Sequence, residues 1–125
     1  MAKAKIMSVD DSPLIHKIVG KALLPAGFEI CGICSNGREA VDSYPAILPD
    51  LLIMDITMPV MDGLEAAQAI IADFPQAKIM LLSAMGDDEL LARARSIGVG
   101  AFMTKPFKAQ ELVQAVESYL NLAST

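Results

Sequence analysis

Short apolar runs alternate with longer stretches of helical periodicity along the whole chain. The apolar runs predict strands over residues 6–9, 28–34, 50–55, 78–82 and 101–103. Apolar residues that recur every three or four positions predict helices near residues 13–23, 36–48, 62–74, 87–97 and 112–120. Because parallel strands need crossover connections, this alternation predicts an α/β fold with a parallel sheet and helices on both faces.

Residues at the predicted helix boundaries support these ranges. Ser12 followed by Pro13 predicts a capped helix start, since proline is favoured at the first helical position. Asn36 and Glu39 have the spacing of a capping box, while Pro45 is expected to kink or shorten the helix that follows them. The run at residues 50–55 is almost continuously apolar, which is typical of a strand buried on both faces, and it ends in a carboxylate.

Length and charge narrow the classes of function. The chain has 125 residues, the size of one domain, so we expect residues 1–125 to form a single unit without a DNA-binding output domain. Its net charge of -5 and the lack of a basic run argue against nucleic acid as a direct partner. The apolar run at residues 6–9 is too short for a signal peptide, and no run approaches a membrane span. We therefore expect a cytoplasmic protein without membrane insertion.

The two cysteines and the single histidine are interpreted as structural. Cys31 and Cys34 lie in a predicted strand, where residues three apart point to opposite faces of the sheet. A thioredoxin-like redox pair would open a helix, and a zinc site would need a second pair of Cys or His ligands. His16 falls on the exposed side of the first predicted helix and is interpreted as a surface residue.

Polar side chains collect at the carboxyl ends of the predicted strands, where open parallel sheets bind ligands. Asp10 and Asp11 follow the first strand, Asp55 ends the third, Ser83 follows the fourth and Lys105 follows the fifth. Taken singly, such residues are usually caps, turn formers or solvated side chains. If the first and third strands are neighbours, the three carboxylates converge and repel one another unless a cation lies between them. Oxygen ligands select a hard divalent ion such as Mg²⁺.

With a metal ion in place, one carboxylate can attack phosphorus and form an aspartyl phosphate. Asp55 is the candidate nucleophile, because it stands alone on its strand end while Asp10 and Asp11 can hold the ion. Lys105 would neutralise the charge of the transferred group, and Ser83 would hydrogen-bond one of its oxygens. Since a carboxylate is already ionised at neutral pH, the attack needs no general base.

Four motifs match one protein family in order and in spacing. They are VDDS at residues 9–12, MDITMPVMDG at 54–63, LSA at 82–84 and KPF at 105–107. The chain resembles, over essentially its whole length, the response-regulator receiver domains of two-component signalling. The resemblance implies a single doubly wound (βα)5 domain, flavodoxin-like and CheY-like, whose five-stranded parallel sheet has the strand order 2-1-3-4-5.

The resemblance also implies roles for the residues at the strand ends. Asp55 accepts a phosphoryl group from the phosphohistidine of a sensor histidine kinase or of a phosphotransfer protein. Asp11 binds Mg²⁺ directly, Asp10 binds it largely through water, and Asp55 and the backbone carbonyl of Thr57 complete the metal ligands. The protein is then a signalling phosphoacceptor that catalyses only its own phosphotransfer and dephosphorylation, and not an enzyme for free substrates.

A conformational switch is implied as well. Ser83 is the switch hydroxyl and Phe102 the switch aromatic, three residues before Lys105, whose peptide bond to Pro106 is often cis in the family. Phosphorylation would alter the face formed by the fourth helix, the fifth strand and the fifth helix, where a downstream effector protein binds. The expected oligomeric state is a monomer or a weak dimer.

Several positions depart from common patterns of the family or vary within it. Phe102 replaces a tyrosine found in some members, so its movement would carry no hydroxyl hydrogen bond. Lys108 stands where many members have a capping aspartate, which predicts a weaker start for the last helix. Thr57 and Met85 occupy positions at which the family tunes the lifetime of the phosphate.

Other interpretations stay open. We expect a stand-alone receiver, with similarity to chemotaxis receivers at residues 36–41 and 83–86, but a receiver excised from a longer transcription regulator is an alternative. A phosphatase or phosphotransferase of the haloacid-dehalogenase type is less consistent, because that family needs an acidic residue where this chain has Thr57. A docking module that is never phosphorylated is disfavoured, because every residue that the chemistry requires is present.

Overall fold

The chain folds into a parallel five-stranded sheet with the order β2-β1-β3-β4-β5. The computed structural model describes residues 2–84 and 86–122, and Met85 lies outside them. The strands are β1 (Lys5–Val9), β2 (Glu29–Cys34), β3 (Leu51–Asp55), β4 (Ile79–Ser83) and β5 (Ala101–Thr104). The helices are α1 (Pro13–Leu23), α2 (Gly37–Ile47), α3 (Gly63–Asp73), α4 (Asp88–Ile97) and α5 (Ala109–Tyr119). The predicted fold class and strand order are confirmed.

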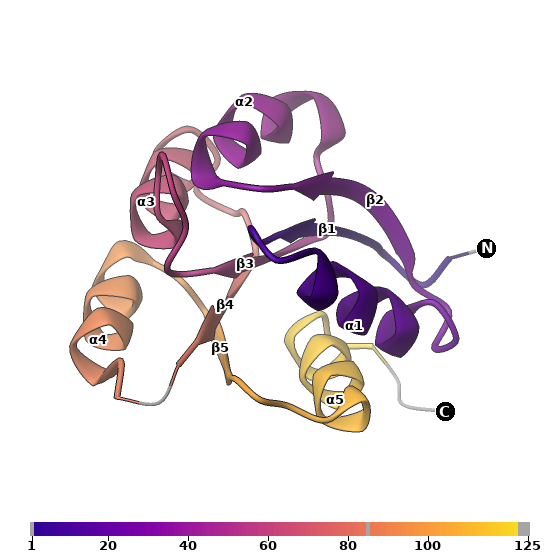
Figure 1. The fold of residues 1–125 in the computed structure, drawn as a ribbon. Coiled ribbons are helices and arrows are strands. Elements are labelled where there is room, and N and C mark those ends of the chain that lie inside the picture. Colours follow the sequence, from indigo (N-terminus) through magenta and orange to yellow (C-terminus); the bar gives the residue numbers. More distant parts are fainter. Residues whose placement is uncertain (1, 85, 123–125) are drawn as a thin grey trace.

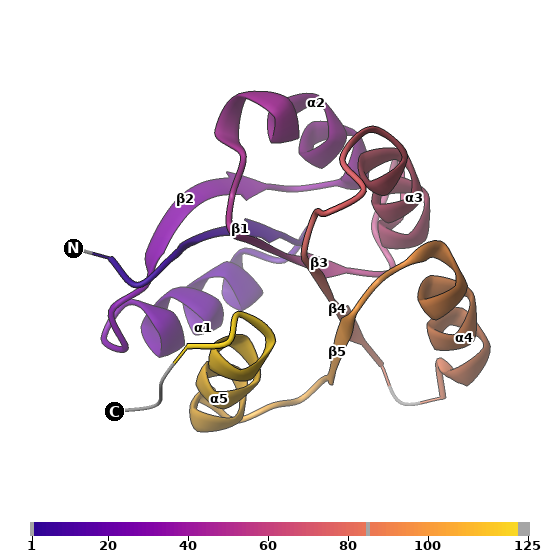
Figure 2. The ribbon, with the colours of Figure 1, turned by 180° about the vertical axis from the view of Figure 1, so that it is seen from behind.

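The helices cover the two faces of the sheet unequally. Helices α1 and α5 lie side by side on one face, and α2, α3 and α4 follow one another across the other (Figures 1 and 2). The chain reverses its winding direction between β2 and β3, because β1 has both of these strands as its neighbours. The carboxyl ends of β1 and β3 therefore lie next to each other, at the position where doubly wound sheets bind ligands.

Each face of the sheet has its own hydrophobic core. One core lies beneath α1 and α5 and includes Ile6, Leu51 and Leu82, while the other lies beneath α2, α3 and α4 and includes Met54 and Leu81. Strands β3 and β4 contribute to both cores, and their apolar side chains are almost fully buried. This burial explains the continuous apolar run at residues 50–55. None of the helices in the described part of the chain has the length and hydropathy needed to cross a bilayer.

The predicted helix starts form with some changes in partners. Asn36 accepts a hydrogen bond from Glu39 N at 2.9 Å, but the Glu39 carboxylate accepts from Ser35 N and not from Asn36 N. Helix α2 continues through Pro45 to Ile47. Ser12 occupies the N-cap position of α1 without a hydrogen bond from its side chain. The expected side-chain cap therefore forms at α2 and not at α1.

Helix α5 begins without a capping side chain at its N-cap. Lys108 offers no acceptor there, in line with the expected weaker start. The Glu111 carboxylate compensates in part, because it accepts a hydrogen bond from Lys108 N at 2.8 Å. The helix therefore keeps one half of a capping box.

A β-bulge in β2 changes the prediction for the two cysteines. Ile6 pairs with Ile30 and Met7 with Gly32, so Cys31 has no partner across the β1–β2 pair. Because the extra residue shifts the alternation of side chains, Cys31 and Cys34 both contact the core beneath α2. The prediction that they point to opposite faces is therefore wrong. Both thiols are free, and burial raises the pKa of each, which fits their interpretation as unreactive packing residues.

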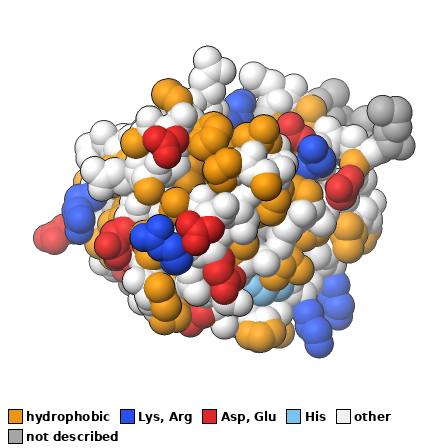
Figure 3. All heavy atoms as spheres, turned by 90° about the horizontal axis from the view of Figure 1, so that it is seen from above, with side chains coloured by type: hydrophobic (Ala, Val, Ile, Leu, Met, Phe, Trp, Pro, Cys, Tyr) orange, Lys and Arg blue, Asp and Glu red, His pale blue; other side chains and the backbone are white. Residues whose placement is uncertain are grey.

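The surface on the α2 side is mixed in character. Acidic and basic side chains lie next to one another on it, between hydrophobic ones (Figure 3). Arg38 and Asp42, one turn apart on α2, form an exposed ion pair with a nitrogen-to-oxygen distance of 3.7 Å. Such a pair contributes at most about 0.5 kcal/mol, so Asp42 is a suitable position for control substitutions.

Candidate functional site

Three carboxylates meet at the carboxyl ends of β1 and β3. Asp10 and Asp11 follow β1, Asp55 ends β3, and one oxygen of each lies within 4.8 Å of the others. The strands that carry them are paired, with Val9 opposite Met54, which brings the two strand ends together. Asp10 is 1% exposed, Asp55 is half-buried and Asp11 is exposed, so the cluster opens to solvent on one side. The predicted convergence of the carboxylates is confirmed in the geometry.

Asp10 is held by contacts from three parts of the chain. Its backbone N donates to Cys34 O at 3.0 Å, and its Oδ1 accepts from Ser12 N at 3.0 Å. Its Oδ2 accepts from the Lys105 ammonium at 3.1 Å. These bonds satisfy the buried carboxylate on the side away from solvent and fix its direction.

Lys105 links the carboxylates to the end of the sheet. Its Nζ lies 3.1 Å from Asp10 Oδ2 and 3.3 Å from Asp55 Oδ1. Its backbone N donates to Ser83 O at 2.7 Å, which places the start of the β5–α5 loop beside the end of β4. The Lys105–Pro106 peptide bond is cis, as the resemblance implies. One ammonium therefore faces two of the three carboxylates.

The charges of the cluster are not balanced by protein groups alone. Burial raises the pKa of the Asp55 carboxyl above its ordinary value, and the Asp10 carboxylate raises it further. The Lys105 ammonium opposes both effects, but the net shift is upward. Ionisation of Asp55 is thus less favourable here than in water, and added positive charge would offset that effect. A divalent cation with oxygen ligands would supply that charge, so the residues present fit Mg²⁺.

The loop after Asp55 is packed tightly against β3. A Cβ at Gly63 would collide with the carbonyl oxygen of Asp55 and would lie 2.9 Å from Ile56 Cα. The backbone N of Gly63 also donates to Ile56 O at 2.7 Å, and Asp62 and Glu65 form a complete capping box for α3. Glycine is required here because the helix start approaches the backbone of the acidic strand end. The exposed Thr57, whose carbonyl is an expected metal ligand, lies within this loop.

Ser83 has an unusual environment for a buried hydroxyl. It is 1% exposed, and its Oγ is the only buried side-chain nitrogen or oxygen in the described part of the chain that has no hydrogen-bond partner. Buried polar atoms are normally paired, and an unpaired one at a ligand site indicates a missing partner. A ligand oxygen held at the end of β4 would be such a partner.

Comparisons with known proteins give the same picture. A family model described as "Response regulator receiver domain" matches residues 6–117. The chain belongs to this family. It is 38% identical over 112 residues to the chemotaxis protein CheY of Thermotoga maritima, covering 90% of this chain and 93% of the relative. It is also 38% identical to CheY of Bacillus subtilis, covering 94% and 98% of the two chains.

A solved structure supports the assignment. The receiver domain aligns with a chain of the CheX–CheY–BeF3–Mg²⁺ complex from Borrelia burgdorferi with a TM-score of 0.87 and 30% identity, covering 91% of this chain and 87% of that one. Receiver domains bind Mg²⁺ at an acidic site, and the acidic cluster of this chain consists of Asp10, Asp11 and Asp55.

Phe102, the expected switch aromatic, lies apart from the carboxylates. Phe102 is half-buried on β5, opposite Leu81 of β4. The Arg95 guanidinium of α4 lies 5.0 Å from the centre of its ring, in a cation–π contact. Phe102 therefore packs at the junction of β5 and α4, and its movement remains a prediction.

The interpretation of His16 as a surface residue is wrong. Its imidazole is half-buried and contacts Ser8 Oγ and Asp10 O, each at 2.8 Å. Helical periodicity does not reveal this contact, because it depends on the first turn of α1 folding back over β1. The signal that could have found it is Ser8, a polar residue inside an otherwise apolar strand.

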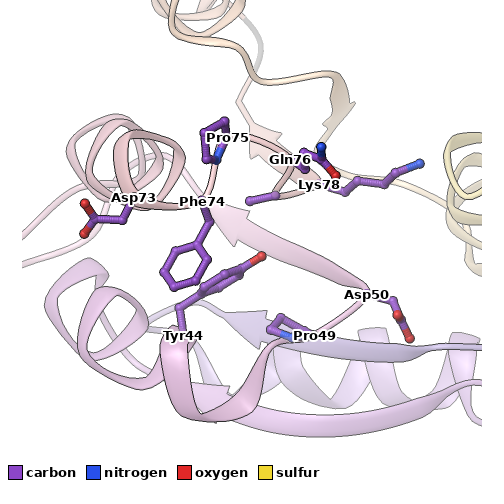
Figure 4. A pocket seen from close by; sticks show the side chains of 9 residues that line it. Tyr44, Pro49, Asp50, Asp73, Phe74, Pro75, Gln76 and Lys78 are labelled. Carbon is purple, nitrogen blue, oxygen red and sulfur yellow. The ribbon is translucent and has the colours of Figure 1, made fainter.

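One cavity of the receiver domain lies at the opposite ends of the strands from the acidic cluster. It has a volume of about 540 Å³ and lies beside the starts of β3 and β4, between Tyr44, Pro49, Phe74 and Lys78 (Figure 4). Lys78 there donates to Tyr119 O at 3.2 Å, and Asp50 accepts from Lys5 N at 2.7 Å. Two of its charged groups thus make structural bonds, and the cavity is separate from the acidic cluster.

The buried hydroxyls of Ser83 and Ser8 allow a test of this geometry. Ser83→Ala is expected to leave the unfolding free energy of the unphosphorylated protein within about 0.5 kcal/mol of wild type, because no hydrogen bond is lost. Ser8→Ala is the matched control, because Ser8 is 2% exposed but bonds to His16, and its loss is expected to cost about 1–2 kcal/mol. Urea unfolding measures both variants. Equal losses would contradict an unpaired hydroxyl at Ser83.

Proposed function

We propose that the chain is a phosphorylation-activated receiver that takes a phosphoryl group onto Asp55 with Mg²⁺. The donor is the phosphohistidine of a sensor histidine kinase or of a phosphotransfer protein. The observation that carries the proposal is the convergence of Asp10, Asp11 and Asp55 at the carboxyl ends of β1 and β3, with the Lys105 ammonium against two of them, Asp10 and Asp55. This set supplies a nucleophile, a metal-binding pair and a fixed positive charge.

In the proposed reaction, an oxygen of Asp55 forms a bond to phosphorus while the phosphorus–nitrogen bond of the phosphohistidine breaks. The imidazole leaves with that electron pair and takes up a proton. Asp10, Asp11, Asp55 and the carbonyl of Thr57 would hold Mg²⁺, which neutralises charge on the phosphoryl oxygens when bound. Lys105 pairs with one phosphoryl oxygen, and the buried Ser83 hydroxyl hydrogen-bonds another.

The output of this reaction is a change of partner affinity. Bonding to the phosphoryl group would draw Ser83 inward, and Phe102 would then turn in, away from Arg95. The surface of α4, β5 and α5 would change, and a downstream effector protein would bind it. We expect a cytoplasmic monomer or weak dimer that contacts neither nucleic acid nor membrane directly and acts as a phosphoacceptor without turnover of free substrates.

The comparisons are consistent with two kinds of protein that would carry out this function. The chain covers at least 93% of the CheY relatives from Thermotoga maritima and Bacillus subtilis, which supports a chemotaxis-like receiver. It is also 37% identical to the transcriptional regulatory protein PdtaR of Mycobacterium tuberculosis, but covers only 55% of that protein. A receiver within a longer regulator is therefore the second candidate.

Purified protein tests the proposal directly. Incubation with Mg²⁺ and a small phosphodonor such as acetyl phosphate is expected to add one phosphoryl group, seen in the intact mass. Chelation of Mg²⁺ by EDTA is expected to prevent the addition, because the three carboxylates then face the incoming phosphate uncompensated. No uptake with Mg²⁺ would favour the docking module, and continuous hydrolysis of a phosphomonoester would favour a phosphatase.

A further inference from the structure

His16 makes two hydrogen bonds that tie the first helix to the first strand. Its Nε2 lies 2.8 Å from Asp10 O, and its Nδ1 lies 2.8 Å from Ser8 Oγ. Because a carbonyl oxygen only accepts, the proton of the first bond must be on Nε2. In the neutral ring, Nδ1 then accepts the hydroxyl proton of Ser8. Each contact thus has a defined direction.

The bond to Asp10 O acts on the peptide that joins the two acidic residues. Asp10 O and Asp11 N belong to one planar peptide unit, so a fixed carbonyl direction fixes the plane from which Asp11 projects. Asp11 is exposed, and its carboxylate makes no hydrogen bond or ion pair among the described residues. Its direction therefore depends on its backbone. The other nearby contacts act on atoms outside this peptide: helix α1 begins only at Pro13, and the bond from Ser12 N goes to the Asp10 carboxylate.

We propose that His16 is a positioning residue that orients the Asp10–Asp11 peptide and thereby aims the Asp11 carboxylate at the metal position. The inference rests on the proposed function, because it assigns His16 to the same metal site. Removing a residue that hydrogen-bonds to a metal ligand commonly lowers metal affinity by about 10-fold to 100-fold. Since His16 acts on the backbone and not on a ligand atom, we expect the lower end of this range.

Three variants separate positioning from simple stability. His16→Met keeps a side chain of similar length but has no donor, and is expected to weaken Mg²⁺ binding about 10-fold. His16→Gln offers an amide N–H to Asp10 O and is expected to recover most of that affinity. Ser8→Ala removes the other bond of the imidazole while leaving Asp10 O paired, and is expected to bind Mg²⁺ within about twofold of wild type. Titration with Mg²⁺, followed by the backbone NMR shifts of residues 8–12, gives the affinities, and urea unfolding gives the stability of each variant.

Stability is controlled by a double variant. Ser8→Ala combined with His16→Met removes the hydroxyl that His16→Met alone would leave buried without a partner. It is expected to unfold at a higher urea concentration than His16→Met and still to bind Mg²⁺ about 10-fold more weakly than wild type. The double variant thus keeps the test informative if His16→Met folds poorly.

Two results would overturn the proposal. One is wild-type Mg²⁺ affinity in the double variant, and the other is an equal loss of affinity in Ser8→Ala and His16→Met, which would indicate a purely structural role. Failure of the proposed function looks different, because wild-type protein would then bind Mg²⁺ without taking up a phosphoryl group. In that case the loss of Mg²⁺ affinity on His16 replacement would still be measured.

Discussion

Asp55→Asn is expected to abolish phosphoryl uptake from a small phosphodonor in the presence of Mg²⁺. The amide that replaces the carboxylate is not nucleophilic. Asp10 is held by Ser12 N and Lys105, and Asp11 belongs to the set that would bind the metal, so we expect neither to replace Asp55 as the nucleophile. The expected reduction is at least about 1,000-fold, since removal of a covalent nucleophile removes the reaction path itself. Intact-mass analysis after a fixed incubation measures it.

The same substitution is expected to stabilise the protein without Mg²⁺. Burial and the nearby Asp10 carboxylate raise the pKa of Asp55, so its ionised form costs folding free energy. The extra stability of Asp55→Asn is expected to be absent below the ordinary carboxyl pKa and to grow as pH rises through the raised pKa. Urea unfolding in EDTA at a series of pH values gives this profile.

Asp42→Asn is the matched control for both measurements. It makes the same chemical change on the exposed face of α2, where the carboxylate forms only a surface ion pair. Its phosphoryl uptake is expected to equal that of wild type, and its unfolding free energy to differ by at most about 0.5 kcal/mol. Full uptake by Asp55→Asn would show that another residue accepts the phosphate. A stability gap that does not change with pH would contradict the role given to the charge.

Lys105→Met is expected to change phosphorylation and metal binding in opposite directions. Loss of the ammonium that faces Asp55 removes a charge that stabilises the transferred group, and similar losses cost about 100-fold in rate. Without this cation, Asp10 and Asp55 face each other uncompensated, so their attraction for a divalent cation rises and Mg²⁺ is expected to bind more tightly. Phosphorylation rates and Mg²⁺ titrations of the same preparation measure the two effects.

Lys108→Met controls for the loss of one positive charge. Lys108 lies at the N-cap of α5, is exposed, and bonds to Glu111 only through its backbone N. Both its phosphorylation rate and its Mg²⁺ affinity are expected to remain within about twofold of wild type, because exposed charges are screened. Weaker Mg²⁺ binding by Lys105→Met would mean that Lys105 holds the carboxylates in place more than it competes with the metal.

Most of the fold could be predicted from local patterns. The continuous apolar run of β3 and the helical periodicity of α1 and α3 place these elements close to their observed bounds. The strand order came from the resemblance to receiver domains, and pairing partners far apart in sequence leave no local pattern that would define it otherwise. The acidic cluster was predictable once that order was assumed, because Asp10 and Asp55 each stand at a strand end.

The errors arise where a contact joins distant segments. Alternation along β2 predicts opposite faces for Cys31 and Cys34, but the bulge at Cys31 depends on how β2 pairs with β1. Helical periodicity predicts an exposed His16. In the structure the imidazole instead turns toward β1, because Asp10 O and Ser8 Oγ are hydrogen-bond partners for its two nitrogens. Neither the pairing register nor the direction of a side chain is contained in residue spacing.

The sequence by itself determined that this chain is acidic and has the α/β pattern and the motifs of the receiver family, with carboxylates, a hydroxyl and an ammonium at its strand ends. Hydrophobic periodicity carries the pattern of strands and helices, because burial depends on which residues share a face. The order and spacing of the four motifs carry the family resemblance. Only the tertiary structure decided that Lys105 bridges Asp10 and Asp55, that Ser83 is left unpaired and that His16 holds the peptide before Asp11. Hydrogen bonds and ion pairs depend on distance and direction to within fractions of an ångström, and these are set only when the whole chain has packed.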